Sequence, residues 1–179
     1  IDGVIADGEW DGATETTMTD GSPLAWMRSG DTLYVALRGH SLGAVNLAIA
    51  IDRELWILHS SAALGSMLYI EDDGVWTLAH DFEWCCRGAN NEAARLALLE
   101  DEGWQANIGF AGDPGIVEYE VTLPWIDAAA AVAYRTENAD PEFCPTDLTP
   151  EAAAELISPF PEEASVRLGE WGQLKTLIP

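Results

Sequence analysis

The chain has 179 residues, of which 48% are hydrophobic, enough for one domain with a sizeable core and too many for a disordered protein. Its 31 acidic residues outnumber 8 basic ones, and the formal net charge of -23 disfavours nucleic acids and anionic membrane surfaces as partners, because the protein repels their phosphates. No segment approaches the roughly 20 apolar residues of a membrane-spanning helix, so membrane insertion is not expected.

The first half of the chain is dominated by β-strand patterns. β-branched and aromatic residues are frequent in residues 32–38, and large and small residues alternate with a period of two in residues 45–51. An acidic turn of the Asp-Gly kind at residues 71–74 is typical of a connection between antiparallel strands. Residues 11–23 are polar and rich in threonine, as in a loop or an edge. Strands are therefore predicted at residues 1–10, 24–28, 32–38, 45–51 and, as three consecutive strands, 54–84.

The pattern changes after residue 84 to that of a helix. Asn90 or Asn91 is a suitable N-cap, and Gly103 stands where a helix would end after about Glu102. Leu96 and Leu99 are expected on the buried side of this helix, which would cover a sheet edge or one end of a sandwich.

The remaining chain returns to strands. Residues 104–110, 116–125 and 165–171 are predicted as strands, whereas residues 128–135 suit either a helix or a strand. Residues 137–163 carry five of the nine prolines and are predicted to form a surface arm with one short helix.

Many short strands with turns between them predict an all-β fold, an antiparallel β-sandwich of the jelly-roll or immunoglobulin-like kind. The whole chain, residues 1–179, is expected to form a single domain. One or two short helices are added to it, one as an insertion near residues 90–103, and the proline-rich arm lies near residues 137–163.

The three cysteines are Cys85, Cys86 and Cys144. Because a bridge between neighbouring residues is geometrically unfavourable, an oxidised form is expected to join one of the neighbours to Cys144, with Cys86 and Cys144 as the predicted pair. The alternative is that all three are reduced, buried thiols. The absence of a CxxC motif argues against a zinc site.

Three segments, in order, resemble the family 9 carbohydrate-binding modules and the related DOMON-like β-sandwich domains. They are IDGVIADGEW at residues 1–10, DTLYVALRG at residues 31–39 and GIVEYEVTLPW at residues 115–125. In that family an entry of the type IDG, spacer, W precedes a strand with LYVA, and a later strand of the type vEfaIPW follows. The resemblance implies an extracellular, non-catalytic binding domain. Members of the family often hold structural calcium, and some grip sugar rings between two tryptophans.

Eight tryptophans are numerous for a chain of this length. The flat apolar face of an exposed indole can stack against the C–H bonds of a sugar ring. Trp84, Trp104 and Trp171 lie near the ends of predicted elements and are the predicted carbohydrate contacts. Trp56 and Trp76, inside apolar strands, are expected to be core residues.

Clustered carboxylates provide the oxygen ligands that calcium prefers. Two acidic clusters have this character, one with Asp7, Glu9 and Asp11 and one in the turn at residues 71–73, and Asp7, Glu9, Asp11 and Asp72 are the predicted ligands of structural calcium. The alternative is that these clusters are solvated turns.

Residues 39–43, GHSLG, match the nucleophile motif of α/β-hydrolases, with Ser41 as the candidate nucleophile. That motif needs a strand before it and a helix after it. Here the following residues alternate with a period of two, and His59 and His80 follow too soon to complete a triad. A turn between two strands is therefore the preferred interpretation, and a serine hydrolase the lesser one.

Some DOMON-like sandwiches bind haem through methionine and histidine or lysine, so a haem site is a further lesser alternative. Its candidate axial ligands are His40, His59 and His80 with Met18, Met27 or Met67.

The sequence as a whole thus predicts a secreted or cell-surface domain that binds a polysaccharide or glycan and is not an enzyme. The alternative is a structural subunit of an extracellular assembly, a homo-oligomer or filament. It is motivated by a detachable-looking N-terminal strand and the proline-rich arm, because sandwiches can add a neighbour's strand to an open edge.

Overall fold

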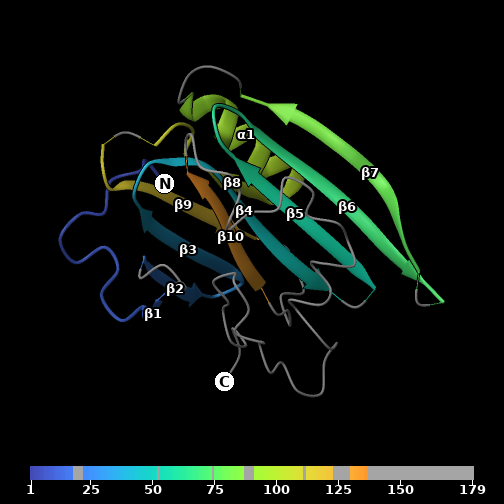
Figure 1. The fold of residues 1–179 in the computed structure, drawn as a ribbon, viewed down its shortest axis with the longest axis horizontal. Helices are drawn as coiled ribbons and strands as arrows, with labels where there is room; N and C mark the ends of the chain where they lie inside the picture. The colour runs from blue at the N-terminus through green and yellow to red at the C-terminus, as the bar shows by residue number, and fades with distance from the viewer. Residues whose placement is uncertain are drawn as a thin grey trace.

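A computed structural model describes residues 1–17, 22–51, 53–73, 75–86, 91–110, 112–122 and 130–136. These residues form two five-stranded sheets in which every pair of neighbouring strands is antiparallel, and one α-helix (Figure 1). The expected all-β antiparallel sandwich with a short helix is confirmed.

The first sheet has the order β1-β2-β3-β9-β8. Its strands are β1 (Thr14–Thr17), β2 (Pro23–Ser29), β3 (Thr32–Gly39), β9 (Gly115–Val121) and β8 (Trp104–Ala106). The second sheet has the order β10-β4-β5-β6-β7. Its strands are β10 (Ala130–Thr136), β4 (Leu42–Ile51), β5 (Glu54–Ser60), β6 (Leu64–Asp72) and β7 (Val75–Cys85). The chain therefore changes sheet between β3 and β4.

The strands with a clear period of two are found where the sequence predicts them, but three segments differ. Residues 1–10 do not form a strand, because Gly3 and Gly8 adopt positive φ values of 80° and 82°, which interrupt an extended chain. The strand predicted at residues 104–110 ends at Ala106, and most of the ambiguous residues 128–135 fall in β10, which continues to Thr136. The proline-rich arm at residues 137–163 and the strand predicted at residues 165–171 lie outside the described residues.

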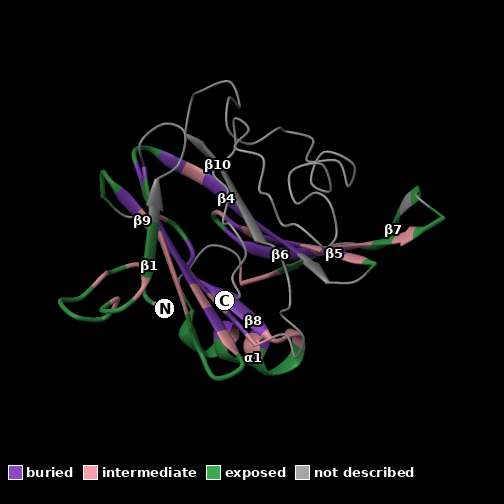
Figure 2. Cartoon of the chain, turned by 90° about the horizontal axis from the view of Figure 1, so that it is seen from below, coloured by how far each residue is buried: buried purple, intermediate pink, exposed green. Residues whose placement is uncertain are grey.

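The core lies between the two sheets. Apolar residues at alternate positions of the central strands β3, β4 and β9 are fully buried, and Figure 2 shows buried stretches along β4, β9 and β8. Tyr119 of β9 crosses the core and donates its hydroxyl proton to the carbonyl of Val45 in β4 at 2.8 Å, with the carbonyl of Leu58 in β5 at 3.3 Å. This contact ties the two sheets together through a buried hydrogen bond.

Helix α1 (Glu92–Glu102) has the predicted caps. The side chain of Asn91 accepts a hydrogen bond from the Ala94 N–H, and Gly103, in the left-handed conformation, donates its N–H to the Leu99 carbonyl. The expectation for Leu96 is wrong, because this side chain is 49% exposed. The buried face is that of Arg95 and Leu98, which lie three residues apart, whereas Leu96 points away from it.

Glu102, at the end of α1, joins the helix to both sheets. Its carboxylate accepts a hydrogen bond from Ser66 of β6 at 2.8 Å and one from the indole N–H of Trp104 in β8 at 3.1 Å. The helix therefore covers the β8 edge of the sandwich, which is one of the two placements expected from the sequence (Figure 1).

The N-terminal segment is held by a fully buried carboxylate, that of Glu118 in β9. One oxygen accepts the backbone N–H groups of Asp2 at 3.0 Å and Gly3 at 2.9 Å, and the other accepts the indole N–H of Trp10 at 3.3 Å. Hydrogen bonds to a charged group are among the stronger ones in proteins, about 1.5–3 kcal/mol each. This carboxylate therefore fixes both ends of residues 1–10.

The side chain of Asn107 is hydrogen-bonded to the backbone of β9 next to Glu118. Its side-chain oxygen accepts the backbone N–H of Glu118 at 2.7 Å, and its side-chain nitrogen donates to the carbonyl of Ile116 at 2.9 Å. The backbone carbonyl of Asn107 accepts a hydrogen bond from Ser60 of β5. A Cβ atom added to Gly3 would lie 2.7 Å from the Asn107 side-chain nitrogen, so the fit requires a glycine.

Helix α1 holds the first residue as well. Buried Arg95 donates a guanidinium N–H to the carbonyl of Ile1. Residues 1–10 are thus held by β9 and α1, which removes the detachable N-terminal strand as one of the two arguments for an extracellular assembly.

Replacing Gly3 by alanine should destabilise the protein more than the same change at Gly12. Both residues have positive φ values, 80° and 86°, so both variants incur the left-handed strain of about 1–2 kcal/mol. Only at Gly3 does the new methyl group meet buried Asn107, which adds roughly 1–3 kcal/mol, because nothing lies within 4 Å of Gly12. Denaturant unfolding of both variants measures the difference, and equal destabilisation would contradict this account of the N-terminal contact.

Candidate functional site

Four paired positions form a row across the second sheet, and this row contains Trp84, the more exposed of the two predicted sugar contacts that the structure describes. Asn46 of β4 pairs with His59 of β5, His59 pairs with Gly65 of β6, and Gly65 pairs with Trp84 of β7. Directly paired residues project from the same face of a sheet. We call these four residues the Trp84 row.

The row lies on the face of the second sheet that points away from the core. Val45 and Leu47, the chain neighbours of Asn46, belong to the core cluster, and so does Leu58, the neighbour of His59. Because successive side chains of a strand point to opposite faces, Asn46 and His59 face outward. The row is therefore separate from the residues that hold the two sheets together.

Trp84 is the exposed end of the row. Its side chain is 45% exposed, and its ring meets the ring of His59 at a centroid distance of 5.4 Å and an interplanar angle of 85°. The two rings come from strands that are not neighbours. They meet because Gly65, which lies between them, has no side chain.

His59 is held in place by hydrogen bonds at both ring nitrogens. Nδ1 lies 2.7 Å from the side-chain oxygen of Asn46, and Nε2 lies 2.9 Å from the hydroxyl oxygen of Ser61. Both ring nitrogens thus have a polar partner, and the Ser61 hydroxyl also donates to the Ala63 carbonyl at 3.4 Å. The ring that supports Trp84 is therefore fixed in orientation.

A disulfide bond follows Trp84 directly. Cys85 and Cys86 are bonded to each other, with Cα atoms 3.8 Å apart, and Cys86 adopts a positive φ of 60°. This corrects the predicted bridge between Cys86 and Cys144: the backbone turn at the end of β7 brings the adjacent sulfurs together. Both cysteines are partly buried against the core. Cys144 lies outside the described residues.

The prediction for Trp104 is wrong, because this residue is fully buried. Its ring stacks on that of Tyr119 with centroids 6.4 Å apart, and its N–H is bound to Glu102. The position of Trp104 near the end of a predicted element favoured an exposed side chain. In the structure α1 covers β8, and Trp104 is buried beneath it. The third predicted contact, Trp171, lies outside the described residues.

The four predicted calcium ligands do not form one site. Asp7, Glu9 and Asp11 belong to the N-terminal loop, whereas Asp72 lies at the end of β6 and binds Arg53 at 2.7 Å, on the opposite side of the molecule (Figures 1 and 2). Within the described ranges, no three histidine, cysteine or acidic side chains gather into a group suited to a metal ion. A structural calcium ion stays a prediction.

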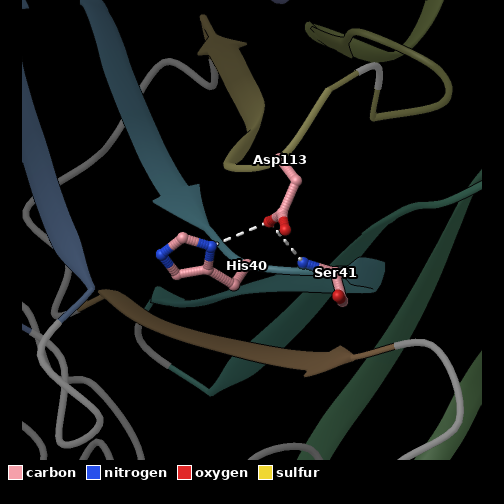
Figure 3. A network of polar contacts seen from close by, with 3 residues as sticks. All are labelled: His40, Ser41 and Asp113. Atoms are coloured by element: carbon pink, nitrogen blue, oxygen red, sulfur yellow. Dashed lines mark hydrogen bonds and ion pairs between the residues drawn. The ribbon is translucent and has the colours of Figure 1, made fainter.

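The GHSLG motif forms the turn between β3 and β4, as predicted (Figure 3). Asp113 faces this turn: its Oδ1 lies 2.8 Å from Nδ1 of His40 and accepts the backbone N–H of Ser41 at 3.3 Å. The Ser41 hydroxyl points away from the His40 ring in Figure 3. A strand follows the motif where a nucleophile elbow needs a helix. The arrangement thus lacks the elbow geometry.

The haem alternative gains no support from the histidines. Both ring nitrogens of His59 are engaged, so a bond from His59 to iron would require one of these contacts to break, whereas the contact of His40 with Asp113 involves Nδ1 alone. Met18 lies outside the described residues.

No protein-family model, no curated protein and no solved structure matches the chain. In the described part of the chain, no helix is both long and apolar enough to cross a bilayer.

The contact between His40 and Asp113 predicts a measurable pKa difference. The hydrogen bond from His40, and then that from the Ser41 N–H, lower the pKa of the Asp113 carboxyl group below its ordinary value. A lowered pKa favours the folded state above the ordinary carboxyl pKa, and this contribution disappears as the pH falls through the lowered value.

Changing His40 to alanine should raise the Asp113 pKa towards the ordinary value, as measured by an NMR titration of the carboxyl carbon. Ser41→Ala is the matched control, because it keeps the backbone N–H and should leave the lowered pKa unchanged. An identical titration of Asp113 in the wild type and the His40 variant would contradict the contact.

Proposed function

We propose that the protein is an extracellular, non-catalytic carbohydrate-binding domain, and that the Trp84 row is its sugar-binding site. The observation that carries the proposal is the partly exposed indole of Trp84 beside a polar group that is held in a fixed orientation. A sugar ring presents C–H bonds on its faces and hydroxyl groups at its rim, so a site for it combines an aromatic surface with fixed hydrogen-bonding groups.

The parts of the row match the first of these requirements. Trp84 supplies the aromatic surface, and the imidazole of His59, held by Asn46 and Ser61, keeps the indole in place. The row crosses four strands of a sheet, and a binding group built on strands is more rigid than one built on loops. A rigid site loses less conformational entropy when a ligand binds.

The family resemblance supports the same function. Three segments carry the resemblance, residues 1–10, 31–39 and 115–125. The first two meet the described part of the third, residues 115–122: β3 pairs with β9, and Glu118 of β9 binds residues 2, 3 and 10. The three segments thus belong to one structural unit. We infer from the resemblance that this unit is a framework of the carbohydrate-binding or DOMON-like type.

The charge of the chain favours a neutral ligand. A net charge of -23 repels polysaccharides that carry uronic acid or sulfate groups, and the repulsion weakens as salt screens it. A neutral glucan, mannan or xylan is therefore expected to bind better than an anionic polysaccharide with similar sugar rings.

Affinity electrophoresis on a panel of soluble neutral and anionic polysaccharides tests the proposal. We expect at least one neutral polysaccharide to retard the wild type, and Trp84→Ala to weaken that binding at least tenfold, equivalent to about 1.4 kcal/mol, because the stacking surface is lost. Leu96→Ala is the matched control: Leu96 is similarly exposed but lies on α1, and its loss should not change the retardation.

Two results would contradict the proposal. One is unretarded migration of the wild type on every polysaccharide and cell-wall sugar in the panel. The other is equal retardation of the wild type and the Trp84 variant, which would place sugar binding elsewhere on the protein.

A second candidate function, a structural subunit of an extracellular assembly, is favoured by one observation. Strand β7 ends the second sheet, and no described strand pairs with its outer side. Open strands of this kind accept a strand from another molecule.

A further inference from the structure

The disulfide between Cys85 and Cys86 lies directly after Trp84, at the point where β7 ends. Cys85 is the last residue of the strand and pairs with Leu64 of β6, and Trp84 is the residue before it and pairs with Gly65. The indole of the proposed sugar site is therefore one peptide bond away from a covalent bond that a reductant can open.

Only a short stretch of pairing holds this end of β7 to β6. Residues 83–85 pair with residues 64–66 in one register, and the register shifts between Ser66 and Leu68. Residues 75–78 pair with β6 in a different register on the other side of that irregularity. Because irregular pairing ends a continuous ladder, the three pairs around Trp84 gain little support from the regular part of the hairpin.

The disulfide fixes the backbone that follows these three pairs. Cys86 has a φ of 60°, in the left-handed region that residues with a β-carbon rarely adopt. The bond between neighbouring cysteines closes a small ring through the peptide bond that joins them, and the turn at Cys86 brings the two sulfurs together. The closed ring therefore keeps Cys86 in this conformation, and no covalent constraint keeps it there once the ring opens.

A reductant can reach this bond, because both cysteines are only partly buried. The thiolate of a dithiol attacks one sulfur and breaks the S–S bond, which forms a mixed disulfide, and the second thiol of the reductant then displaces the protein sulfur. The dithiol becomes a cyclic disulfide and gives up two electrons and two protons, and Cys85 and Cys86 become two thiols. Exchange with another disulfide restores the bond.

We propose that the Cys85–Cys86 disulfide is a thiol–disulfide exchange site that controls the Trp84 row. In the oxidised protein the turn at Cys86 holds Trp84 against His59, and in the reduced protein the end of β7 departs from this position and sugar affinity falls. The effect on affinity rests on the proposed function at Trp84, whereas the effect on the contact between Trp84 and His59 does not.

The backbone preference of Cys86 gives the size of the effect. An L-residue disfavours the left-handed conformation roughly fivefold to thirtyfold, equivalent to about 1–2 kcal/mol. Once the ring is open, the fraction of molecules with Trp84 in its binding position falls by this factor. The apparent affinity for a ligand falls in proportion to the fraction of binding-competent protein.

Treatment with dithiothreitol tests the proposal. Cys144→Ser is made in every protein, so that a thiol titration reports on Cys85 and Cys86 alone. Reduction should raise the dissociation constant for the neutral polysaccharide that the oxidised protein retains roughly fivefold to thirtyfold, and reoxidation with glutathione disulfide should restore it. In NMR spectra the indole signal of Trp84 should move on reduction, and that of buried Trp104 should stay in place.

Two double variants separate the backbone effect from the chemical treatment. Cys85→Ala with Cys86→Ala removes the bond, keeps a β-carbon at residue 86 and should bind as weakly as the reduced protein. Cys85→Ala with Cys86→Gly removes the same bond, but glycine adopts positive φ about as readily as negative φ, so its affinity should fall only about twofold. Neither variant should respond to dithiothreitol.

An unmoved Trp84 signal after both thiols have been titrated would overturn the proposal. So would movement of the Trp84 and Trp104 signals together, because the bond would then stabilise the whole fold, and so would equal binding by the alanine and glycine variants. Movement of the Trp84 signal without a change in affinity would overturn the control of binding. If the oxidised protein retains no polysaccharide, the proposed function fails, and the Trp84 signal alone then supports or overturns the exchange site.

Discussion

The buried carboxylate of Glu118 is the contact on which the ordered N-terminal part of this structure depends. A carboxylate withdrawn from water is costly unless hydrogen bonds replace its hydration. Here two backbone N–H groups and one indole N–H provide them, all from residues 2–10. The same contact satisfies donors of the N-terminal loop that would otherwise lack partners. The N-terminal loop and β9 therefore stabilise each other. If either were buried alone, the Glu118 carboxylate or the N–H groups of the loop would lack hydrogen-bond partners.

The contacts that hold the fold together involve several surfaces of the sandwich. The inner faces of both sheets are filled by the core, α1 covers the β8 edge, and the N-terminal loop is fastened to β9. On the outer face of the second sheet Asn46, Leu55 and Ile57 are buried, and Trp84 at the β7 end is exposed. The Trp84 row lies on that face, where an aromatic and several polar side chains are aligned by strand register. Fold stability and the proposed binding thus rest on different residues.

Much of the fold could be predicted because it depends on local patterns. The period of two predicted the central strands, and asparagine and glycine at the correct spacing predicted the caps of α1. Trp84 was a candidate carbohydrate contact because it lies near the end of a predicted strand. Leu96 and Trp104 were predicted wrongly, because exposure depends on what covers a residue, and the covering element is distant in sequence.

Other features of the structure could not be predicted from a single sequence. The role of Glu118 requires residues more than 100 positions away to meet it, and an acidic residue in a strand normally indicates a solvated position. The Trp84 row requires the registers of three strand pairs, which a period of two does not supply. The bond between Cys85 and Cys86 depends on the backbone turn at Cys86, where a positive φ cannot be inferred from the residue type.

The most direct test of the proposed binding site is an NMR titration of the tryptophan indole N–H signals with a neutral oligosaccharide of the type that the protein retains. The account predicts that the Trp84 signal shifts progressively and saturates, accompanied by the ring signals of His59, while the signal of buried Trp104 stays in place. A titration in which the oligosaccharide binds but the Trp84 and His59 signals do not move would contradict it.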